Sequence, residues 1–208
     1  MSQAGQSGMP RFLHVGCGKL RKHRTLKPFN TPEWEEIRLD IDARVEPDIV
    51  DTLPELLKVE SNSFDAVYSS HCLEHLYPHE VPIALDAFHR VLKDNGIAIA
   101  RCPDLQTLAE HLASGEIDKP LYVSGRGPVS PLDMLYGFRP AMADGNLYMA
   151  HHTGFTAKTI GESFKTAQFR STLCLRMPAR RELWVIATRA SISKEEMVEL
   201  AKIYVTPL

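Results

Sequence analysis

A short apolar run that stops at two glycines constrains the fold of this chain more than any other feature. Phe12-Leu13-His14-Val15 is long enough for a buried strand, and Gly16-Cys17-Gly18 follows it directly. Glycine adopts positive φ angles at little cost, and it has no side chain to keep a ligand away from the backbone. We therefore expect a buried strand that enters a tight turn, with the turn accessible to a ligand.

Strand-like and helix-like patterns alternate along the rest of the chain. The expected parallel strands lie at 12–15, 37–41, 48–51, 65–70 and 97–102, and the expected helices at 81–92, 105–112, 156–167 and 193–204. The first of these helices is expected to end at the glycine signal Asp94-Asn95-Gly96. Alternating runs at 171–177 and 182–188 predict an antiparallel hairpin. The expected fold class is α/β, with a Rossmann-like, doubly wound, mostly parallel sheet and an antiparallel C-terminal hairpin.

The length of 208 residues fits one domain. Residues 1–10 are small and polar, and we expect them to form a disordered leader to a single domain over 11–208. Residues 114–154 are rich in Gly and Pro and have no sustained period, so an irregular insert is expected there. A segment of that length is typical of a lid, a binding loop or a contact between two copies, and both the lid and the homodimer are left open.

Composition excludes several classes of partner. Hydrophobic residues make up 44% of the chain and the formal net charge is −2, which is typical of a soluble protein and argues against nucleic-acid or anionic membrane partners. The basic run at 19–27 is interpreted as a solvated loop. The four cysteines are far apart and form no CxxC pair, so we expect reduced thiols and a cytoplasmic location.

An acidic residue ends the second expected strand. Asp40 lies 22 positions beyond Gly18, and a carboxylate there can accept hydrogen bonds from both hydroxyls of a ribose. Asp42 is an alternative that the sequence leaves open. The third glycine of the dinucleotide fingerprint is absent, and Lys19-Leu20-Arg21-Lys22 does not open a clear helix for a pyrophosphate. A ligand with ribose and adenine but no pyrophosphate therefore fits better than NAD.

Five motifs stand in order between residues 12 and 112. They are a glycine-rich motif at 14–18, an acidic motif at 40–42, a short strand at 47–51, a strand with its following turn at 63–75, and a helix-to-strand junction at 90–96. Together they resemble the motifs of class I S-adenosylmethionine-dependent methyltransferases, of the type-11-like methyltransferase domain subgroup. The resemblance implies a seven-stranded fold and S-adenosyl-L-methionine as the cofactor.

The same resemblance implies the cofactor-binding residues. Gly16 and Gly18 would approach the methionine portion, and Asp40 the ribose. The complete predicted set contains Val15, Gly16, Cys17, Gly18, Asp40, Ile41, Asp51, Thr52, Ser70 and His71, with Asp51 and Thr52 beside the adenine and Ser70 and His71 beneath the sulfonium. Cys17 has no base beside it and is interpreted as a small residue that fits the turn, not as a nucleophile.

Three histidines are candidates for catalysis. His71, His151 and His152 could each accept a proton from an acceptor nucleophile, because histidine titrates near neutral pH. For His151 and His152, a structural role at the start of the helix near Thr156 is equally consistent with the sequence.

His71-Cys72-Leu73-Glu74-His75 also fits the H-x-x-E-H zinc-protease pattern. That site needs both histidines on one helical face and a third ligand. Here the motif begins where a strand ends, so no metal is expected. Glu74 and His75 then either pack and pair at a helix start or take part in catalysis.

The reaction expected from the resemblance is direct transfer of a methyl group to an oxygen or nitrogen of an acceptor. A small molecule, or a sugar or lipid intermediate, is the expected acceptor, since the chain has no basic, aromatic-rich pattern for nucleic acid. Two alternatives are a catalytically silent protein that binds S-adenosylmethionine or S-adenosylhomocysteine, and an NAD-dependent oxidoreductase.

Overall fold

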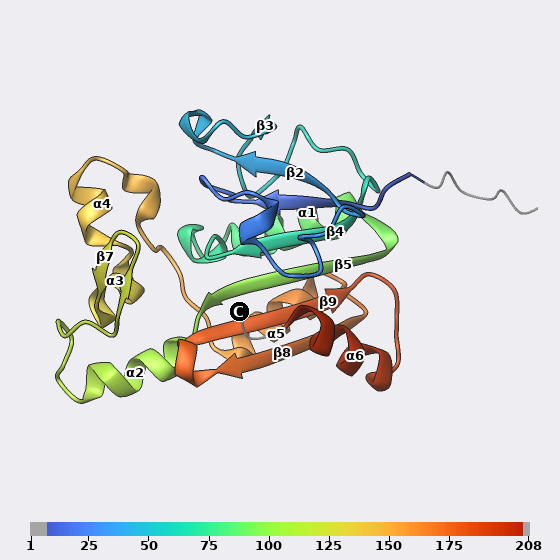
Figure 1. The fold of residues 1–208 in the computed structure, drawn as a ribbon. Coiled ribbons are helices and arrows are strands. Elements are labelled where there is room, and N and C mark those ends of the chain that lie inside the picture. Colours follow the sequence, from blue (N-terminus) through green and yellow to red (C-terminus); the bar gives the residue numbers. More distant parts are fainter. Residues whose placement is uncertain (1–7, 206–208) are drawn as a thin grey trace, which may run out of the picture.

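Seven strands form one mixed sheet in the computed structural model, which describes residues 8–205 (Figure 1). The strands are β1 Arg11–Val15, β2 Glu35–Asp40, β3 Ile49–Val50, β4 Phe64–Ser70, β5 Leu92–Pro103, β8 Ser171–Met177 and β9 Glu182–Thr188. Their order is β3-β2-β1-β4-β5-β9-β8; β1 to β5 run parallel, and β9 runs antiparallel to both β5 and β8. The expected α/β fold with a reversed C-terminal strand is confirmed. Most of the predicted leader, residues 1–7, lies outside the described residues.

The order in which successive strands are added to the sheet reverses beside β1. The chain moves from β1 outward to β2 and β3, then returns to place β4 on the other side of β1. Val15 is level with both Leu39 and Ser69, so β1, β2 and β4 end at one height. In parallel α/β sheets, ligands bind in the crevice outside such a reversal point.

The two faces of the sheet are covered differently. Helices α1, Val81–Val91, and α5, Ala157–Thr166, pack on one face. The other face is covered by α6, Lys194–Tyr204, and by the irregular segment 19–34. Within that segment Phe29 stacks on Phe12 of β1 at 4.3 Å between ring centroids. The chain after Gly18 therefore covers the sheet without forming an α-helix.

The junction between α1 and β5 differs from the expectation. The helix ends at Val91, and Leu92 already pairs with Phe64 as the first residue of β5. Leu92 is buried, whereas residues 94–95 are exposed at an irregularity in the strand pairing. Gly96 has no positive φ angle, so it is not the left-handed cap that its position suggested. Burial of Leu92 against β4 overrides the local glycine signal.

The segment expected to be irregular contains short regular elements beyond the carboxyl ends of the parallel strands (Figure 1). After α2, Leu105–Ala113, come β6 Tyr122–Ser124, β7 Gly127–Val129, α3 Pro131–Tyr136 and α4 Arg139–Ala143. A small core of Leu108, Val129 and Met134 joins α2, β7 and α3. These elements have three to six residues, which is too short for hydrophobic periodicity to identify them.

Five single turns of 3-10 helix complete the described structure. They are η1 Lys22–Arg24, η2 Ala43–Val45, η3 Leu73–His75, η4 Leu147–Met149 and η5 Pro178–Arg180. Two of them, η2 and η3, directly follow the carboxyl ends of β2 and β4, where a ligand is expected.

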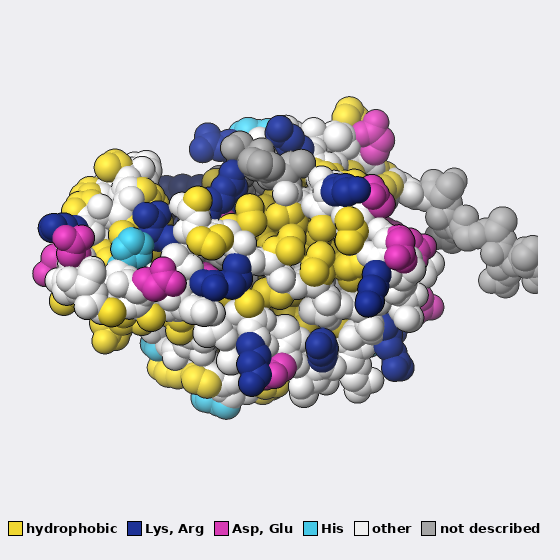
Figure 2. Space-filling view, turned by 90° about the horizontal axis from the view of Figure 1, so that it is seen from below, with side chains coloured by type: hydrophobic (Ala, Val, Ile, Leu, Met, Phe, Trp, Pro, Cys, Tyr) yellow, Lys and Arg dark blue, Asp and Glu magenta, His cyan; other side chains and the backbone are white. Residues whose placement is uncertain are grey.

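The edge strand β8 lies at the surface, and each of its residues is partly exposed. Figure 2 shows hydrophobic side chains gathered in the middle of the face seen from below, with Lys and Arg side chains around them. Leu173, Leu175 and Met177 of this strand pack against the core shared with α6. Between residues 8 and 205, no helix has the length and apolar character needed to span a membrane.

The first glycine of the turn after β1 should tolerate substitution less well than the second. Gly16 has φ +65°, and an added Cβ would lie 2.5 Å from Cys72 Sγ. Gly18 has φ +50° with no atom within 4 Å of an added Cβ. We expect Gly16→Ala to lower the free energy of unfolding by about 2–3 kcal/mol and Gly18→Ala by about 1 kcal/mol. Urea unfolding of both variants checks this, and equal losses would contradict it.

Candidate functional site

A cavity of about 630 Å³ opens at the carboxyl ends of β1, β2 and β4. The predicted cofactor residues that line it are Val15, Gly16, Gly18, Asp40, Ile41, Asp51 and His71, and the catalytic candidate His152 also lines it. Cys17, Thr52, Ser70 and His151 were predicted as well but do not line it. Its volume lies within the range of small-molecule and cofactor sites.

Asp40 fixes the glycine turn from the end of β2. Its Oδ2 accepts a hydrogen bond of 2.7 Å from the Gly18 backbone N–H, and its Oδ1 accepts one of 2.9 Å from the Asp42 N–H. A carboxylate has about four acceptor positions, so further positions are free for a ligand. Asp42 instead places both oxygens on the Arg44 guanidinium, at 2.8 and 2.9 Å, and these hydrogen bonds lower the pKa of Asp42.

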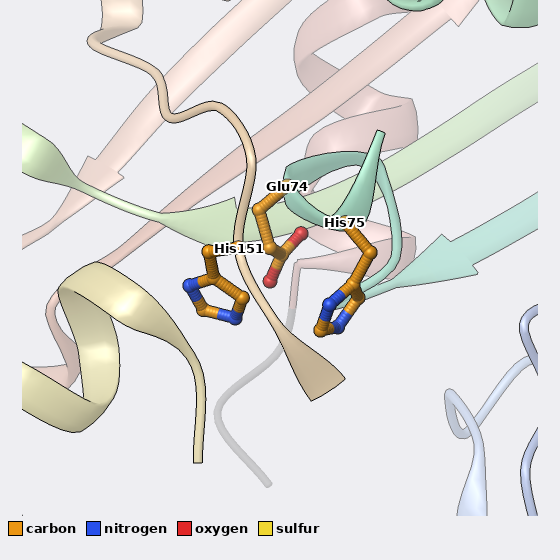
Figure 3. A group of neighbouring side chains, drawn as sticks. All are labelled: Glu74, His75 and His151. Atoms are coloured by element: carbon orange, nitrogen blue, oxygen red, sulfur yellow. The ribbon is translucent and has the colours of Figure 1, made fainter. Parts of the chain in front are cut away.

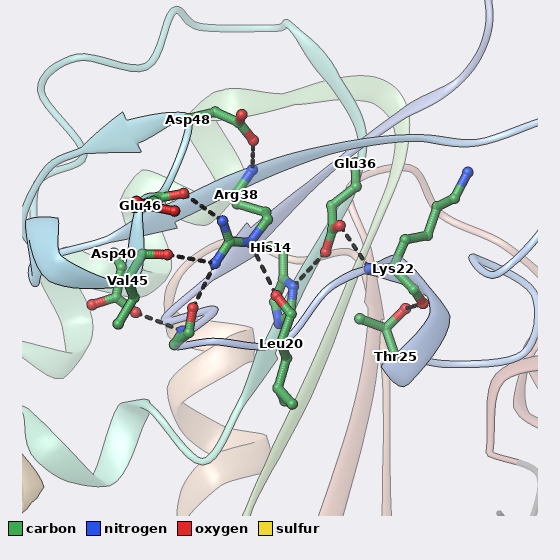
Figure 4. A network of polar contacts seen from close by, with 11 residues as sticks. His14, Leu20, Lys22, Thr25, Glu36, Arg38, Asp40, Val45, Glu46 and Asp48 are labelled. Atoms are coloured by element: carbon green, nitrogen blue, oxygen red, sulfur yellow. Dashed lines mark hydrogen bonds and ion pairs between the residues drawn. The ribbon is translucent and has the colours of Figure 1, made fainter.

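Arg38 joins the glycine turn to the loop after β2 (Figure 4). Its side chain is only 2% exposed and donates to the carbonyl oxygens of Leu20 at 3.0 Å, Gly18 at 2.6 Å, Glu46 at 2.6 Å and Val45 at 3.1 Å. A buried cation is stable only when its donors are satisfied, and here backbone carbonyl dipoles satisfy them. Arg38 was not predicted as a site residue, although a charged residue inside a buried strand is a recognisable signal.

The basic loop after Gly18 is hydrogen-bonded to β2, the strand that contains Arg38. His14 Nδ1 lies 2.7 Å from Glu36 Oε1, and Glu36 Oε2 accepts a hydrogen bond of 2.7 Å from the Lys22 N–H (Figure 4). The Lys22 ammonium donates to the carbonyl oxygens of Thr31 and Trp34, both at 2.8 Å. Lys22 therefore stabilises the conformation of this loop.

His71 is part of a row of alternating charges behind the cavity. Its Nε2 lies 3.2 Å from Glu182 Oε1 and its Nδ1 lies 3.3 Å from Glu74 Oε1. Glu182 Oε1 also accepts a hydrogen bond of 2.7 Å from Arg101. Partial desolvation opposes the charge on His71, whose side chain is 41% exposed, but the contacts with Glu182 and Glu74 outweigh it and raise the pKa of His71 to about 9. A histidine that is protonated at neutral pH cannot act as a general base there.

The other two histidine candidates occupy different environments. His152 is exposed to the cavity and stacks on Tyr77, with ring centroids 4.2 Å apart. His151 is half-buried behind it, its Nδ1 lies 2.9 Å from the Met134 carbonyl oxygen, and burial lowers its pKa. Hydrogen bonds from the backbone N–H groups of His152 and Thr153 to the Glu74 carbonyl oxygen, at 2.9 and 3.2 Å, hold this segment in place.

Several cavity residues were missed because they lie outside the recognised motifs. Leu53 follows the predicted adenine residues directly. Tyr77 follows η3, while Arg126 and the turn 146–149 belong to the segment after α2. For Arg126 and the turn 146–149, the only indication in the sequence was the expectation of a lid in that segment.

All four cysteines are free thiols, as expected. Cys17 is buried, and burial raises its pKa to about 12, so it remains protonated at neutral pH. This agrees with a packing role and not with a nucleophile.

The sheet order, the reversed strand and the cavity define the Rossmann-like fold of class I methyltransferases. Residues 13–100 match a family model described as a methyltransferase domain. No curated protein sequence matches the chain. The matched segment, residues 13–100, is therefore similar in sequence to methyltransferase domains.

Solved structures with this fold share little sequence with the chain. A Burkholderia thailandensis 1,6-didemethyltoxoflavin-N1-methyltransferase, solved with bound 1,6-didemethyltoxoflavin and S-adenosylhomocysteine, is 17% identical. The TM-score is 0.53, and the match covers 86% of this chain and 71% of that one. A possible histamine N-methyltransferase from Thermotoga maritima is 14% identical, with a TM-score of 0.54 and coverages of 86% and 82%. A Methanosarcina mazei S-adenosylmethionine-dependent methyltransferase is 13% identical, with a TM-score of 0.55 and coverages of 89% and 95%. At these identities the likeness concerns the fold alone.

Replacing Arg38 should destabilise the whole glycine-turn region. Arg38→Met removes the donors and leaves four carbonyl oxygens without their partner. We expect a loss of about 3–5 kcal/mol in the free energy of unfolding, measured in urea. Arg24→Met, at an exposed position of the same loop, is the matched control and should change stability by less than about 0.5 kcal/mol. Similar values for the two variants would contradict the role of Arg38.

The charge on His71 predicts how stability depends on pH. The pKa of His71 is about 9 in the folded protein, against about 6.5 for a histidine in an unfolded chain. Its contribution to stability is therefore complete below about pH 6.5 and is lost as the pH rises through about 9. Tm should fall between pH 7 and 10, and His71→Asn should make that fall shallower. Parallel curves for the two proteins would show that another group causes it.

Proposed function

We propose that this protein transfers a methyl group from S-adenosyl-L-methionine to an oxygen or nitrogen of a small molecule or of a sugar or lipid intermediate. The observation that carries the proposal is the convergence of Gly18 and Asp40 in one cavity at the reversal point of a class I methyltransferase sheet. S-adenosylmethionine would supply the electrophilic methyl group, while the residues of the chain bind, orient and exclude water.

The donor fits the residues on the strand-end side of the cavity. Gly18 leaves open space beside its backbone, and Asp40 keeps acceptor positions for ribose hydroxyls. Ile41 and Leu53 offer apolar surface for an adenine beside Asp51. Thr52 and Ser70 lie outside the cavity lining, so we assign them a supporting role behind it.

The acceptor would bind on the opposite side, against the segment after α2. His152 and Tyr77 form a stacked pair on the cavity wall, and the turn 146–149 with Arg126 closes over it. We assign His152, rather than His71, as the base for an acceptor hydroxyl, because the two carboxylates keep His71 protonated. Since the segment lines the cavity, a lid is proposed in preference to a dimer contact.

Two other functions fit the observations less well. An NAD-dependent oxidoreductase needs a helix N-terminus at the glycine turn, and among the described residues only η1 lies between Gly18 and β2. A silent binding protein would keep the donor side of the cavity and lack turnover. A cytoplasmic location and a homodimer stay predictions from the sequence.

Binding of S-adenosylhomocysteine tests the donor site. Asp40→Asn keeps an acceptor for the Gly18 N–H but loses the charge that binds ribose hydroxyls, so we expect about 10- to 100-fold weaker binding by calorimetry. Asp42→Asn is the control, because Asp42 is already paired with Arg44, and its affinity should stay within about threefold of the wild type. The opposite ranking would make Asp42 the ribose ligand. NAD that binds where S-adenosylhomocysteine does not would overturn the proposal.

Turnover distinguishes the enzyme from the silent protein. Methylation of a panel of hydroxyl, amine and sugar-lipid acceptors is followed by release of S-adenosylhomocysteine. We expect turnover with at least one acceptor, and a loss of about 10²- to 10⁴-fold in kcat for His152→Ala if a hydroxyl is methylated. Tight donor binding without turnover on any acceptor would favour the silent protein.

A further inference from the structure

Glu74, His75 and His151 form a compact cluster beside the cavity (Figure 3). One carboxylate oxygen and one ring nitrogen of each histidine all lie within 4.8 Å of one another. Glu74 and His75 come from η3 after β4, and His151 comes from the irregular segment between η4 and α5. Figure 3 shows the carboxylate pointing between the two imidazole rings.

The carboxylate of Glu74 is buried and lacks hydrogen bonds. The residue is 1% exposed, and neither oxygen has a hydrogen-bond partner among the described residues. Its nearest cation is His71, at 3.3 Å from Oε1. A buried carboxylate with this ion pair and no hydrogen bond still carries a desolvation cost, so Glu74 can bind a further cation.

Both histidines of the cluster have one ring nitrogen bound to the backbone. His75 Nδ1 lies 2.9 Å from the Ala150 carbonyl oxygen, and His151 Nδ1 lies 2.9 Å from the Met134 carbonyl oxygen. A carbonyl oxygen only accepts, so each Nδ1 donates its proton to the backbone, and Nε2 is the ring nitrogen left for another ligand. Metal-binding histidines are usually oriented by this kind of hydrogen bond from the second ring nitrogen.

The cluster therefore combines a buried carboxylate with two imidazole rings that are each oriented by a backbone carbonyl oxygen. A cation between them would satisfy all three ligand atoms. Two histidines and one glutamate form a known zinc ligand set, with a further position for water or substrate.

We propose that Glu74, His75 and His151 bind one divalent first-row transition-metal ion, with Zn²⁺ as the best match to the ligands. His75 lines the cavity, and His151 is followed by His152, which also lines it. The open coordination position of the ion would therefore face the acceptor side of the cavity.

The site uses only part of the H-x-x-E-H pattern noted in the sequence. His71, the first residue of that pattern, faces Glu182 as well as Glu74, and His151 takes its place in the cluster. The H-x-x-E-H pattern alone predicted no metal, because His71 and His75 do not share a helical face there. His151, which is 76 positions beyond His75, reaches them only through the packing of distant segments.

Modest side-chain rotation would complete the site. Tetrahedral zinc with bonds of about 2.0–2.2 Å places its ligand atoms about 3.3 Å apart, which is closer than the 4.8 Å limit of the cluster. A bound metal could hold an acceptor oxygen or nitrogen near the donor and lower the pKa of an acceptor hydroxyl. That role rests on the proposed methyl transfer, whereas the metal site does not.

Metal titration of the full chain, first treated with chelator, tests the proposal. We expect one Zn²⁺ per chain by calorimetry, and a visible Co²⁺ spectrum of the four-coordinate type that Zn²⁺ abolishes. His151→Ala and the nearly isosteric Glu74→Gln should each weaken Zn²⁺ binding by 100-fold or more, about 2.7 kcal/mol. His23→Ala, at an exposed histidine far along the chain from the cluster, is the matched control and should bind as the wild type does.

S-adenosylhomocysteine binding is measured on the same samples. Circular dichroism and thermal unfolding show that each variant is folded. The S-adenosylhomocysteine measurement separates the two proposals, since zinc binding without S-adenosylhomocysteine binding would overturn only the proposed function. The metal proposal is overturned if the wild type binds no stoichiometric Zn²⁺, or if folded His151→Ala and Glu74→Gln bind Zn²⁺ as tightly as His23→Ala does.

Discussion

The buried guanidinium of Arg38 is the interaction on which the rest of the site depends. It holds the carbonyl oxygens of Gly18 and Leu20 on one side and those of Val45 and Glu46 on the other. The two loops that frame the cavity are therefore joined through one side chain of β2. Because no α-helix follows the glycine turn, these hydrogen bonds do the positioning that a helix would otherwise do.

Asp40 completes that frame two residues further along β2. Its carboxylate accepts a hydrogen bond from the Gly18 N–H, and Arg38 donates one to the Gly18 carbonyl oxygen. Both backbone polar groups of Gly18 are therefore fixed by side chains of β2. On the other side of β1, the strand end of β4 leads into His71, Glu74 and His75. The reversal beside β1 thus separates the residues on β2, to which we assign the donor, from those after β4, to which we assign the acceptor.

The sequence predicted the parts of the structure that depend on local patterns. The strands, the reversed hairpin and the pocket residues Gly16, Gly18 and Asp40 follow from apolar runs, glycine turns and strand-end acids, and each lies in or near its expected place. The short elements after α2 escaped prediction because their stability comes from contacts with α2 rather than from their own periodicity. The pairing of His151 with Glu74 escaped because it depends on how distant segments pack.

A crystal structure of the protein with S-adenosylhomocysteine tests the central claim most directly. We expect electron density in the cavity between the glycine turn and the loop after β3, with the ribose hydroxyls within hydrogen-bond distance of Asp40 and the sulfur facing the side of His152. A ligand bound elsewhere on the protein, or a ribose held by Asp42 with Asp40 pointing away, would contradict it.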